Sequence, residues 1–379
     1  MQVEYYTFVK EWDKQLDTSL DSEQTLILVF GLADSSQIKI PLKDLQKNFH
    51  NSIIIGASTA GEIVMDELHD NSLVVTIVKF DTTKIKLSTK NISAEKNSFT
   101  IGSSIANELK NEDLKSIFIL SDGLNINGSE LTHGFNDVID SSTIISGGLA
   151  GDDGKFESTW VIIDGQAKTN YVSAIGLYGD NIRIGYGSHG GWDIFGIQRK
   201  VTHSQDNIVY EVDNQPILDI YKKYLGEKAK ELPASGLLFP LGLYDMDDRN
   251  KIIVRTILAI DEEKKSITFA GNIPQNSTVC LMKSNNNRLI DAAYNSSKDI
   301  DLQDYKDEPL LNIAISCIGR KLVLKQRAEE ELVAVYENLP KNSIQVGFYS
   351  YGEISPTGLI GCDLHNQTMT LTTLWEKDA

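Results

Sequence analysis

The sequence has few residues of the kinds that build disulfide frameworks, metal clusters or membrane spans. Its three cysteines, Cys280, Cys317 and Cys362, are widely spaced and odd in number among 379 residues. They indicate neither a set of disulfides nor a CxxC metal site, so a reducing cytoplasm is the expected location. No apolar run approaches the roughly 20 residues that span a bilayer, and the first residues lack the pattern of a signal peptide. We therefore expect a cytoplasmic protein that does not use a membrane.

Basic residues are scarce relative to acidic ones. The chain has 36 Lys and Arg against 53 Asp and Glu, which gives a formal net charge of -17. Binding to nucleic acid or to an anionic membrane needs concentrated Lys and Arg, so neither is an expected partner. The hydrophobic share of 41% and the charged share of 23% are ordinary for a globular protein.

One local pattern occurs three times, as IIIGASTAGEI (53–63), TIISGGLAGDDG (143–154) and IQVGFYSYGEI (344–354). Each is an apolar strand that runs into a glycine followed by a carboxylate, as in Gly61-Glu62, Gly151-Asp152 and Gly352-Glu353. Five positions before that glycine stands another small residue, which is Gly56, Ser146 or Gly347. Strands that end in small residues let another backbone or a ligand approach closely. We predict a repeated unit whose strand ends converge on one pocket between the domains.

A second apolar strand precedes each copy, at residues 26–31, 117–123 and 313–319. Before the third copy, residues 328–339 carry apolar side chains at helical spacing until Pro340 ends the run. A crossover through a helix favours parallel pairing of the two strands. We therefore predict an α/β fold of two domains, 25–213 and 214–375, built from repeated strand–helix–strand units around mixed sheets.

Nine segments in fixed order carry a family resemblance. They are GASTAGEI, GGLAGDDGKF, GSHGGWDIFG, VTHSQDNIVYEVDNQPILDIYKKYLGE, LLFPLG, VRTILAID, SCIGRKLVLKQRAEEEL, GFYSYGEISP and LHNQTMTLTT. Together they resemble the bacterial FIST proteins, which have an N-terminal and a C-terminal FIST domain, over roughly residues 25 to 375. The resemblance implies a non-enzymatic sensory module of bacterial signal transduction that binds a small ligand. For one subset of the family it further implies bound haem b, nitric oxide sensing, and a separate histidine kinase or cyclic-di-GMP protein as partner.

A haem needs an axial ligand, and we take His365 as the first candidate among the six histidines. It begins a Thr-rich strand in which His365 and Met369 share one face but lie about 13 Å apart, so both cannot ligate one iron. A single histidine would leave the other face of the iron open to a diatomic gas. The alternative is that His365 is a core histidine with a hydrogen-bonding role.

A small polar metabolite such as an amino acid is the competing ligand. It would bind at the glycine–acid strand ends (Gly61, Glu62, Gly151, Asp152, Tyr349, Gly352 and Glu353), where the carboxylates could accept an ammonium group. Arg255 or Arg320 could hold a carboxylate in a bidentate pair, although an interdomain salt bridge is the alternative for each. A third interpretation is a hydrolase or transferase with Cys317 as its thiolate. Because no base lies near Cys317 in sequence, we expect no enzymatic activity.

Overall fold

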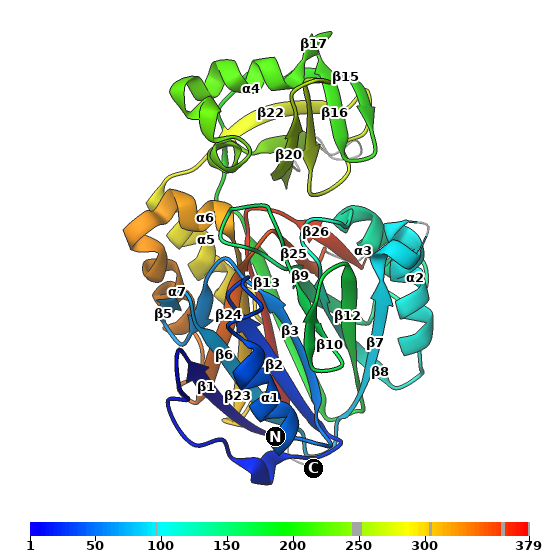
Figure 1. The fold of residues 1–379 in the computed structure, drawn as a ribbon, viewed down its shortest axis with the longest axis vertical. Coiled ribbons are helices and arrows are strands. Elements are labelled where there is room, and N and C mark those ends of the chain that lie inside the picture. The colour runs from blue at the N-terminus through cyan, green and yellow to red at the C-terminus, as the bar shows by residue number, and fades with distance from the viewer. Residues whose placement is uncertain (96, 245–251, 303–304, 358–360, 378–379) are drawn as a thin grey trace.

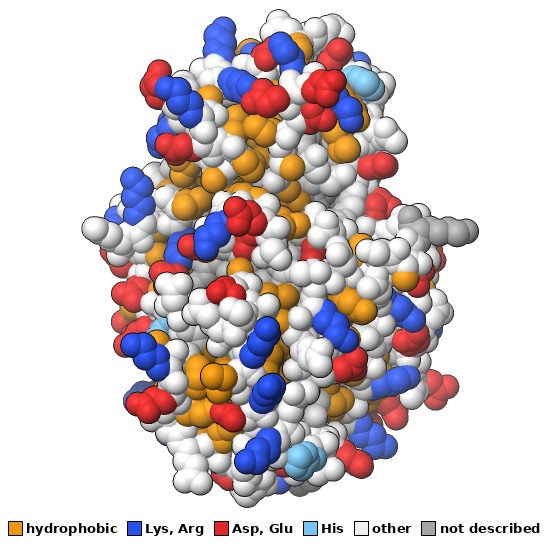
Figure 2. Space-filling model, in the orientation of Figure 1, with side chains coloured by type: hydrophobic (Ala, Val, Ile, Leu, Met, Phe, Trp, Pro, Cys, Tyr) orange, Lys and Arg blue, Asp and Glu red, His pale blue; other side chains and the backbone are white. Residues whose placement is uncertain are grey.

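The computed structural model describes residues 1–95, 97–244, 252–302, 305–357 and 361–377. Figure 1 shows a large lobe that contains both chain ends and a small lobe at the top of the view. The small lobe is one continuous insertion, from Arg199 to Lys283. Figure 2 shows hydrophobic side chains where the lobes meet and in a second group low on the large lobe, with charged side chains spread over that face.

The large lobe consists of three six-stranded sheets with the same strand order. The first contains β1 (Gln2–Phe8), β6 (Leu73–Lys79), β2 (Thr25–Gly31), β3 (Ile53–Ser58), β10 (Val161–Ile163) and β11 (Gln166–Lys168). The second contains β7 (Lys84–Asn91), β12 (Tyr171–Tyr178), β8 (Leu114–Ser121), β9 (Ile144–Leu149), β25 (Gly352–Pro356) and β26 (Cys362–His365). The third contains β13 (Ile182–His189), β27 (Met369–Glu376), β23 (Leu310–Cys317), β24 (Ser343–Ser350), β4 (Glu62–Val64) and β5 (Glu67–His69).

In each sheet the two central strands are parallel and the other pairs are antiparallel. The chain crosses between the parallel strands through helices, namely α1 (Lys39–Asn48), α3 (Gly128–Asn136), and α6 (Ile318–Leu324) with α7 (Ala328–Tyr336). The predicted α/β fold of repeated strand–helix–strand units around mixed sheets is therefore confirmed. Two further helices are α2 (Ser98–Leu109), which packs on α3, and α5 (Asn286–Lys298), which packs on α7.

The three units exchange strands in a ring. The hairpin that follows each unit's second parallel strand crosses to a neighbouring sheet: β4–β5 joins β24, β10–β11 joins β3, and β25–β26 joins β9. The outer strands cross in the same way, since β7 follows β6 but pairs with β12, and β13 follows β12 but pairs with β27. β1 takes the equivalent place beside β6 and closes the ring, which brings the two chain ends together (Figure 1). The two sequence halves therefore share their sheets.

A glycine at one equivalent position in each unit lets the parallel strands pack closely. A Cβ atom on Gly56, Gly147 or Gly347 would lie 2.2, 1.9 or 1.7 Å from a carbonyl oxygen of the neighbouring strand. No side chain fits at these distances, which explains why glycine recurs there. The equivalent residue in the second unit is Gly147, one position after the Ser146 that the sequence comparison aligned here.

The small lobe is inserted between the second and third units and has its own hydrophobic core. Its strands, in sheet order, are β19 (Ile252–Arg255), β18 (Leu241–Tyr244), β22 (Thr278–Lys283), β15 (Arg199–Gln205), β16 (Ile208–Val212), β21 (Ser266–Phe269) and β20 (Ile257–Asp261). β14 (Asp193–Ile194) pairs with β22, β17 (Gln215–Pro216) pairs with β16, and α4 (Ile217–Leu225) packs on β16. The predicted division between residues 213 and 214 falls inside this lobe, directly before β17.

Short 3-10 helices complete the described secondary structure. They are η1 (Thr18–Leu20), η2 (Ile92–Ala94), η3 (Gly226–Glu231), η4 (Ala234–Leu238) and η5 (Lys325–Arg327). Among the residues described, no helix is both long and apolar enough to cross a membrane.

Candidate functional site

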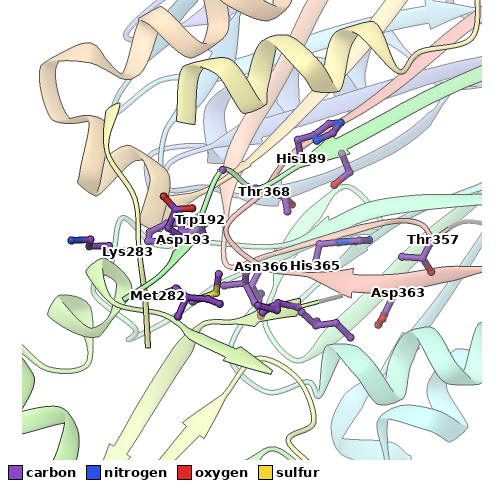
Figure 3. A pocket seen from close by; sticks show the side chains of 17 residues that line it. His189, Trp192, Asp193, Met282, Lys283, Thr357, Asp363, His365, Asn366 and Thr368 are labelled. Carbon is purple, nitrogen blue, oxygen red and sulfur yellow. The ribbon is translucent and has the colours of Figure 1, made fainter. Parts of the chain in front are cut away.

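A cavity of about 770 Å³ lies between the two lobes (Figure 3), a volume typical of small-ligand sites. The large lobe contributes the end of β13, the turn that follows it, and β26 with the residues after it. The small lobe contributes β19 and the end of β22. The lining residues are Ser188–Ile194, Ile252–Val254, Met282, Lys283, Thr357, Asp363, His365, Asn366 and Thr368.

His365, the predicted metal ligand, lies in the wall of this cavity (Figure 3). It ends β26, where it pairs in register with Glu353 of β25, and its side chain is half-buried. Asp363 stands two residues earlier on the same strand and also lines the cavity, as alternation along a strand requires. His189, from β13, lines the cavity as well, and its Nε2 lies 2.7 Å from Oδ2 of Asp299.

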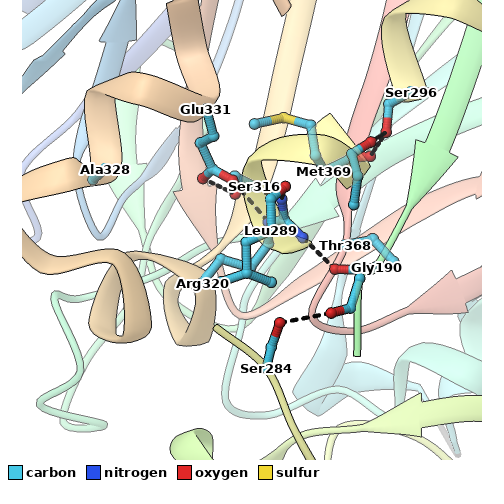
Figure 4. Close-up of polar contacts among 12 residues, drawn as sticks. Gly190, Ser284, Leu289, Ser296, Ser316, Arg320, Ala328, Glu331, Thr368 and Met369 are labelled. Atoms are coloured by element: carbon cyan, nitrogen blue, oxygen red, sulfur yellow. Dashed lines mark hydrogen bonds and ion pairs between the residues drawn. The ribbon is translucent and has the colours of Figure 1, made fainter. Parts of the chain in front are cut away.

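Arg320 does not line the cavity, but it contacts Gly190, which does. Figure 4 shows its hydrogen bonds. Its Nε and Nη2 donate to Oε2 of Glu331 at 3.0 and 2.7 Å, and both side chains are fully buried. Nη1 donates to the carbonyl oxygen of Gly190 at 2.5 Å. Glu331 also accepts hydrogen bonds from Ser316 and from the Tyr349 hydroxyl, at 2.9 and 2.8 Å. Arg320 and Tyr349 thus belong to a closed internal network that supports the wall, and burial raises the pKa of Tyr349 well above its ordinary value.

Glu62 and Glu353 occupy equivalent places in the first and third units. Each pairs across to the strand carrying the packing glycine, opposite Phe348 and Gly148 respectively. Glu62 accepts hydrogen bonds from the Thr59 hydroxyl and from the amide and hydroxyl of Ser72. In both carboxyls burial outweighs the hydrogen bonds and raises the pKa to about 7.

Glu353 is connected to the cavity through one residue. It accepts from the Ser350 hydroxyl at 2.6 Å, and from the amide and hydroxyl of Thr368 at 3.0 and 2.9 Å. Thr368 itself lines the cavity. Glu353 therefore lies directly behind the wall that carries His365, although it does not line the cavity.

Asp152 has a different role from the other two acids. It accepts hydrogen bonds from the amides of Phe156, Glu157 and Ser158 at 2.7–2.9 Å and from the Tyr351 hydroxyl, so it orders the loop that follows. Glu62 and Glu353 each pair with the residue that follows a packing glycine. The residue in that position for the second unit is Val161, which pairs with Ala57 after Gly56.

The three strand ends meet through backbone hydrogen bonds and strand pairing rather than around an open pocket. The Ala60 amide donates to Tyr349 O at 2.8 Å, and the Gly151 amide donates to Ser58 O at 2.9 Å. Gly352 pairs with Leu149. Near Gly61, Lys321 Nζ donates to Ala60 O at 2.8 Å and to Asp70 at 2.6 Å. The glycine at the end of the first unit thus has a protein ammonium group beside it.

Arg255 joins the two lobes. It ends β19 in the small lobe, is only 3% exposed, and donates from Nη1 to Leu364 O at 3.0 Å and from Nη2 to Ser129 Oγ at 3.3 Å in the large lobe. Burial lowers its pKa. Because Val254 and the neighbours of Leu364 line the cavity, Arg255 fixes one cavity wall to the other.

Cys317 is fully buried, and burial raises the pKa of its thiol. A nucleophilic cysteine needs the opposite shift and access to substrate. Cys317 is therefore not placed to act as a nucleophile.

Sequence reasoning missed Asp363 and the small-lobe wall formed by Ile252–Val254, Met282 and Lys283. The strand alternation that was applied to His365 and Met369 would have placed Asp363 on the same face. No comparable pattern pointed to the small-lobe wall, because its strands have the same sequence pattern as any other series of β-hairpins.

The fold and the cavity define a two-lobed α/β protein with an interlobe cavity. The FIST N domain model matches residues 25–215 and the FIST C domain model matches residues 218–356, so the chain belongs to the FIST family. FIST domains are sensory domains of signal transduction that bind small ligands. The chain is also 25% identical over 244 residues to an uncharacterised protein of Methanocaldococcus jannaschii. That match covers 57% of this chain and 46% of the relative, so the chain spans about half the length of the curated relative it matches.

Proposed function

We propose that this protein senses a small ligand in the cavity between its lobes and passes the signal to a separate protein, such as a histidine kinase or a cyclic-di-GMP enzyme. The observation that carries the proposal is that both lobes line the cavity. A ligand that contacts both walls stabilises one relative position of the lobes over others. The position of the lobes then determines which surface the partner meets.

Haem b with nitric oxide as its signal is the first candidate ligand. His365 would hold the iron, Ile252, Val254 and Met282 would pack against the porphyrin, and Lys283 would lie near a propionate. These lining residues fit the group in kind, since they combine one imidazole with apolar side chains and a cation. Bound haem would supply an iron that takes up a diatomic gas.

A small polar metabolite is the second candidate. The cavity carries a carboxylate, Asp363, and a cation, Lys283, on different walls. That arrangement suits a zwitterion such as an amino acid.

The test is an absorption spectrum of the protein from cells supplied with a haem precursor, before and after reduction and addition of nitric oxide. A near-stoichiometric Soret band that shifts with the gas is expected for wild type and is expected to be lost in His365→Ala. His69→Ala is the matched control, because His69 pairs with Glu62 as His365 pairs with Glu353, but lies partly exposed outside the cavity. Normal haem binding by His365→Ala would exclude His365 as the ligand.

A colourless protein that also fails to take up added hemin would exclude haem. Amino acids and other small metabolites would then be screened for thermal stabilisation, because a ligand that binds only the folded protein raises its melting temperature.

A further inference from the structure

We propose that the turn formed by Gly190, Gly191 and Trp192 is the anion-binding element of the interlobe cavity and recognises a carboxylate of the ligand. The inference rests on the proposed function only in assuming that this cavity is the ligand site. It names the chemical group that the ligand must carry.

The turn lies in the cavity wall, and two of its carbonyl groups are bound by residues that do not line the cavity. Arg320 Nη1 donates to Gly190 O at 2.5 Å, and Ser284 Oγ donates to Gly191 O at 2.6 Å (Figure 4). Neither Arg320 nor Ser284 lines the cavity. Both carbonyls are therefore held from the far side of the wall.

The next two amide groups consequently face the cavity. In a planar trans peptide the N–H points opposite to the C=O, so the fixed carbonyls of Gly190 and Gly191 direct the amides of Gly191 and Trp192 to the cavity side. Within the described part of the chain, neither amide donates a backbone hydrogen bond. Two adjacent free amides beside a residue of left-handed conformation form a concave anion site.

The conformation that creates this site requires glycine at one position only. Gly191 has φ +80°, and a Cβ atom there would lie 2.5 Å from Arg288 O. Gly190 has no such constraint, since its Cβ would meet nothing closer than 3.4 Å. The chain thus supplies a matched pair of neighbouring glycines for substitution.

Among the residues described, the charged ones that line the cavity are one cation, Lys283, and two carboxylates, Asp193 beside the turn and Asp363 on β26. Lys283 lines the cavity and pairs in strand register with Asp193, the residue that follows the turn. The carboxylate of Asp193 is neutralised by Arg288 at 2.5 Å. Hydrogen bonds from backbone amides to a carboxylate are charge-assisted and stronger than neutral ones. The carboxylate could be a haem propionate or the carboxylate of a metabolite, and the experiment separates these sources.

The test observes the Gly191 amide directly in protein labelled with [1-13C,15N]glycine. The sequence contains two Gly-Gly pairs, Gly147-Gly148 and Gly190-Gly191, so only the amides of Gly148 and Gly191 are preceded by a labelled carbonyl. Sodium acetate, titrated against sodium chloride at equal ionic strength, should shift the Gly191 amide saturably. Gly148 lies in β9 and should not respond. A Gly191 signal that follows chloride as it follows acetate would overturn the inference.

Variants show whether the turn geometry is responsible. Ser284→Ala, which releases the Gly191 carbonyl, should weaken acetate binding about fivefold, the effect of one lost hydrogen bond. Gly190→Ala should retain binding and Gly191→Ala should lose it, each read from the Lys283 side-chain signal with melting temperature as the folding control. Unchanged acetate affinity in Ser284→Ala and in folded Gly191→Ala would contradict the proposed geometry.

Two ligand pairs identify the source of the carboxylate. Hemin should bind more tightly than its dimethyl ester if the source is a propionate, and glycine more tightly than glycinamide if it is an amino acid. Binding of hemin or a metabolite without any shift of Gly191 would overturn this inference and leave the proposed function intact. A Gly191 response to acetate in a protein that binds neither would support the anion site and reject the proposed ligands.

Discussion

Replacement of Glu353 by Gln should change how stability depends on pH. Burial raises the pKa of this carboxyl from its ordinary 4.5 to about 7. Between these values the folded protein keeps a proton that the unfolded chain has released, so the free energy of unfolding falls as pH rises through this window. At about 1.4 kcal/mol per pH unit, Glu353 costs the folded state about 3 kcal/mol above pH 7 relative to pH 4.5.

Gln can take over the hydrogen bonds without ionising. Its carbonyl oxygen can accept from the amide and hydroxyl of Thr368, and its amide group can donate to the Ser350 hydroxyl, because that hydroxyl can also accept. We therefore expect Glu353→Gln to match wild type near pH 5 and to exceed its stability at pH 8 by up to about 3 kcal/mol.

The assay is urea unfolding of both proteins at intervals from pH 5 to pH 8, with the difference in unfolding free energy plotted against pH. Glu62→Gln, at the equivalent place in the first unit, should give a curve of the same shape, since burial raises the pKa of Glu62 to about 7 as well. A flat difference in both variants would mean that the hydrogen bonds keep the carboxylates ionised, and would refute the argument from burial.

Three further predictions concern the framework. Arg320→Met should lower the free energy of unfolding in urea by about 3–5 kcal/mol, because it leaves Glu331 buried without its partner; Arg327→Met, at an exposed pair, should change little. Gly347→Ala should abolish two-state thermal unfolding, since the new Cβ would lie 1.7 Å from a carbonyl oxygen. In Glu376, hydrogen bonds outweigh burial and lower the pKa to about 2, so Glu376→Gln should lose stability near pH 7, with the loss shrinking as pH falls below 4.5; a constant loss would contradict this.

The repeat could be predicted from the sequence because it arises from close packing between two strands of the same unit. Parallel strands that approach closely need a residue without a side chain, and Gly56, Gly147 and Gly347 meet that need within each unit. Strand exchange between units could not be read, because pairing of hairpins such as β25–β26 with β9 joins residues about two hundred positions apart.

The roles of the polar residues were harder to predict, since residue type does not reveal the partner. Arg320 was a reasonable candidate for binding a carboxylate, and it does bind one, but the carboxylate belongs to Glu331. Asp152 follows the glycine–acid pattern in sequence. Because a loop intervenes before the hairpin, the residue that is structurally equivalent to Glu62 and Glu353 is Val161. His365 lies in the cavity wall, while its role as a metal ligand remains a prediction.

The interlobe cavity lies beside the one of the three hairpins that the small lobe contacts through β19 in the described part of the chain. The residues that end these hairpins are His69, Lys168 and His365, and the small lobe contacts the hairpin that ends at His365, through β19. The three units are locked to one another by exchanged strands, so moving one requires breaking the pairing of its neighbours. The small lobe is a single insertion with a core cluster of its own. Arg255 is one of several buried ties between this lobe and the ring, together with the hydrogen bonds of Thr256 to Asn366 and of Gln367 to Leu237. We therefore expect a ligand in the cavity to move the small lobe over the ring rather than one unit of the ring against another. Loss of the Arg255 tie, as in Arg255→Met, should increase amide hydrogen exchange in β19 and β26 while leaving β2 and β8 protected. Equal loss of protection in all four strands would place the flexibility in the ring instead.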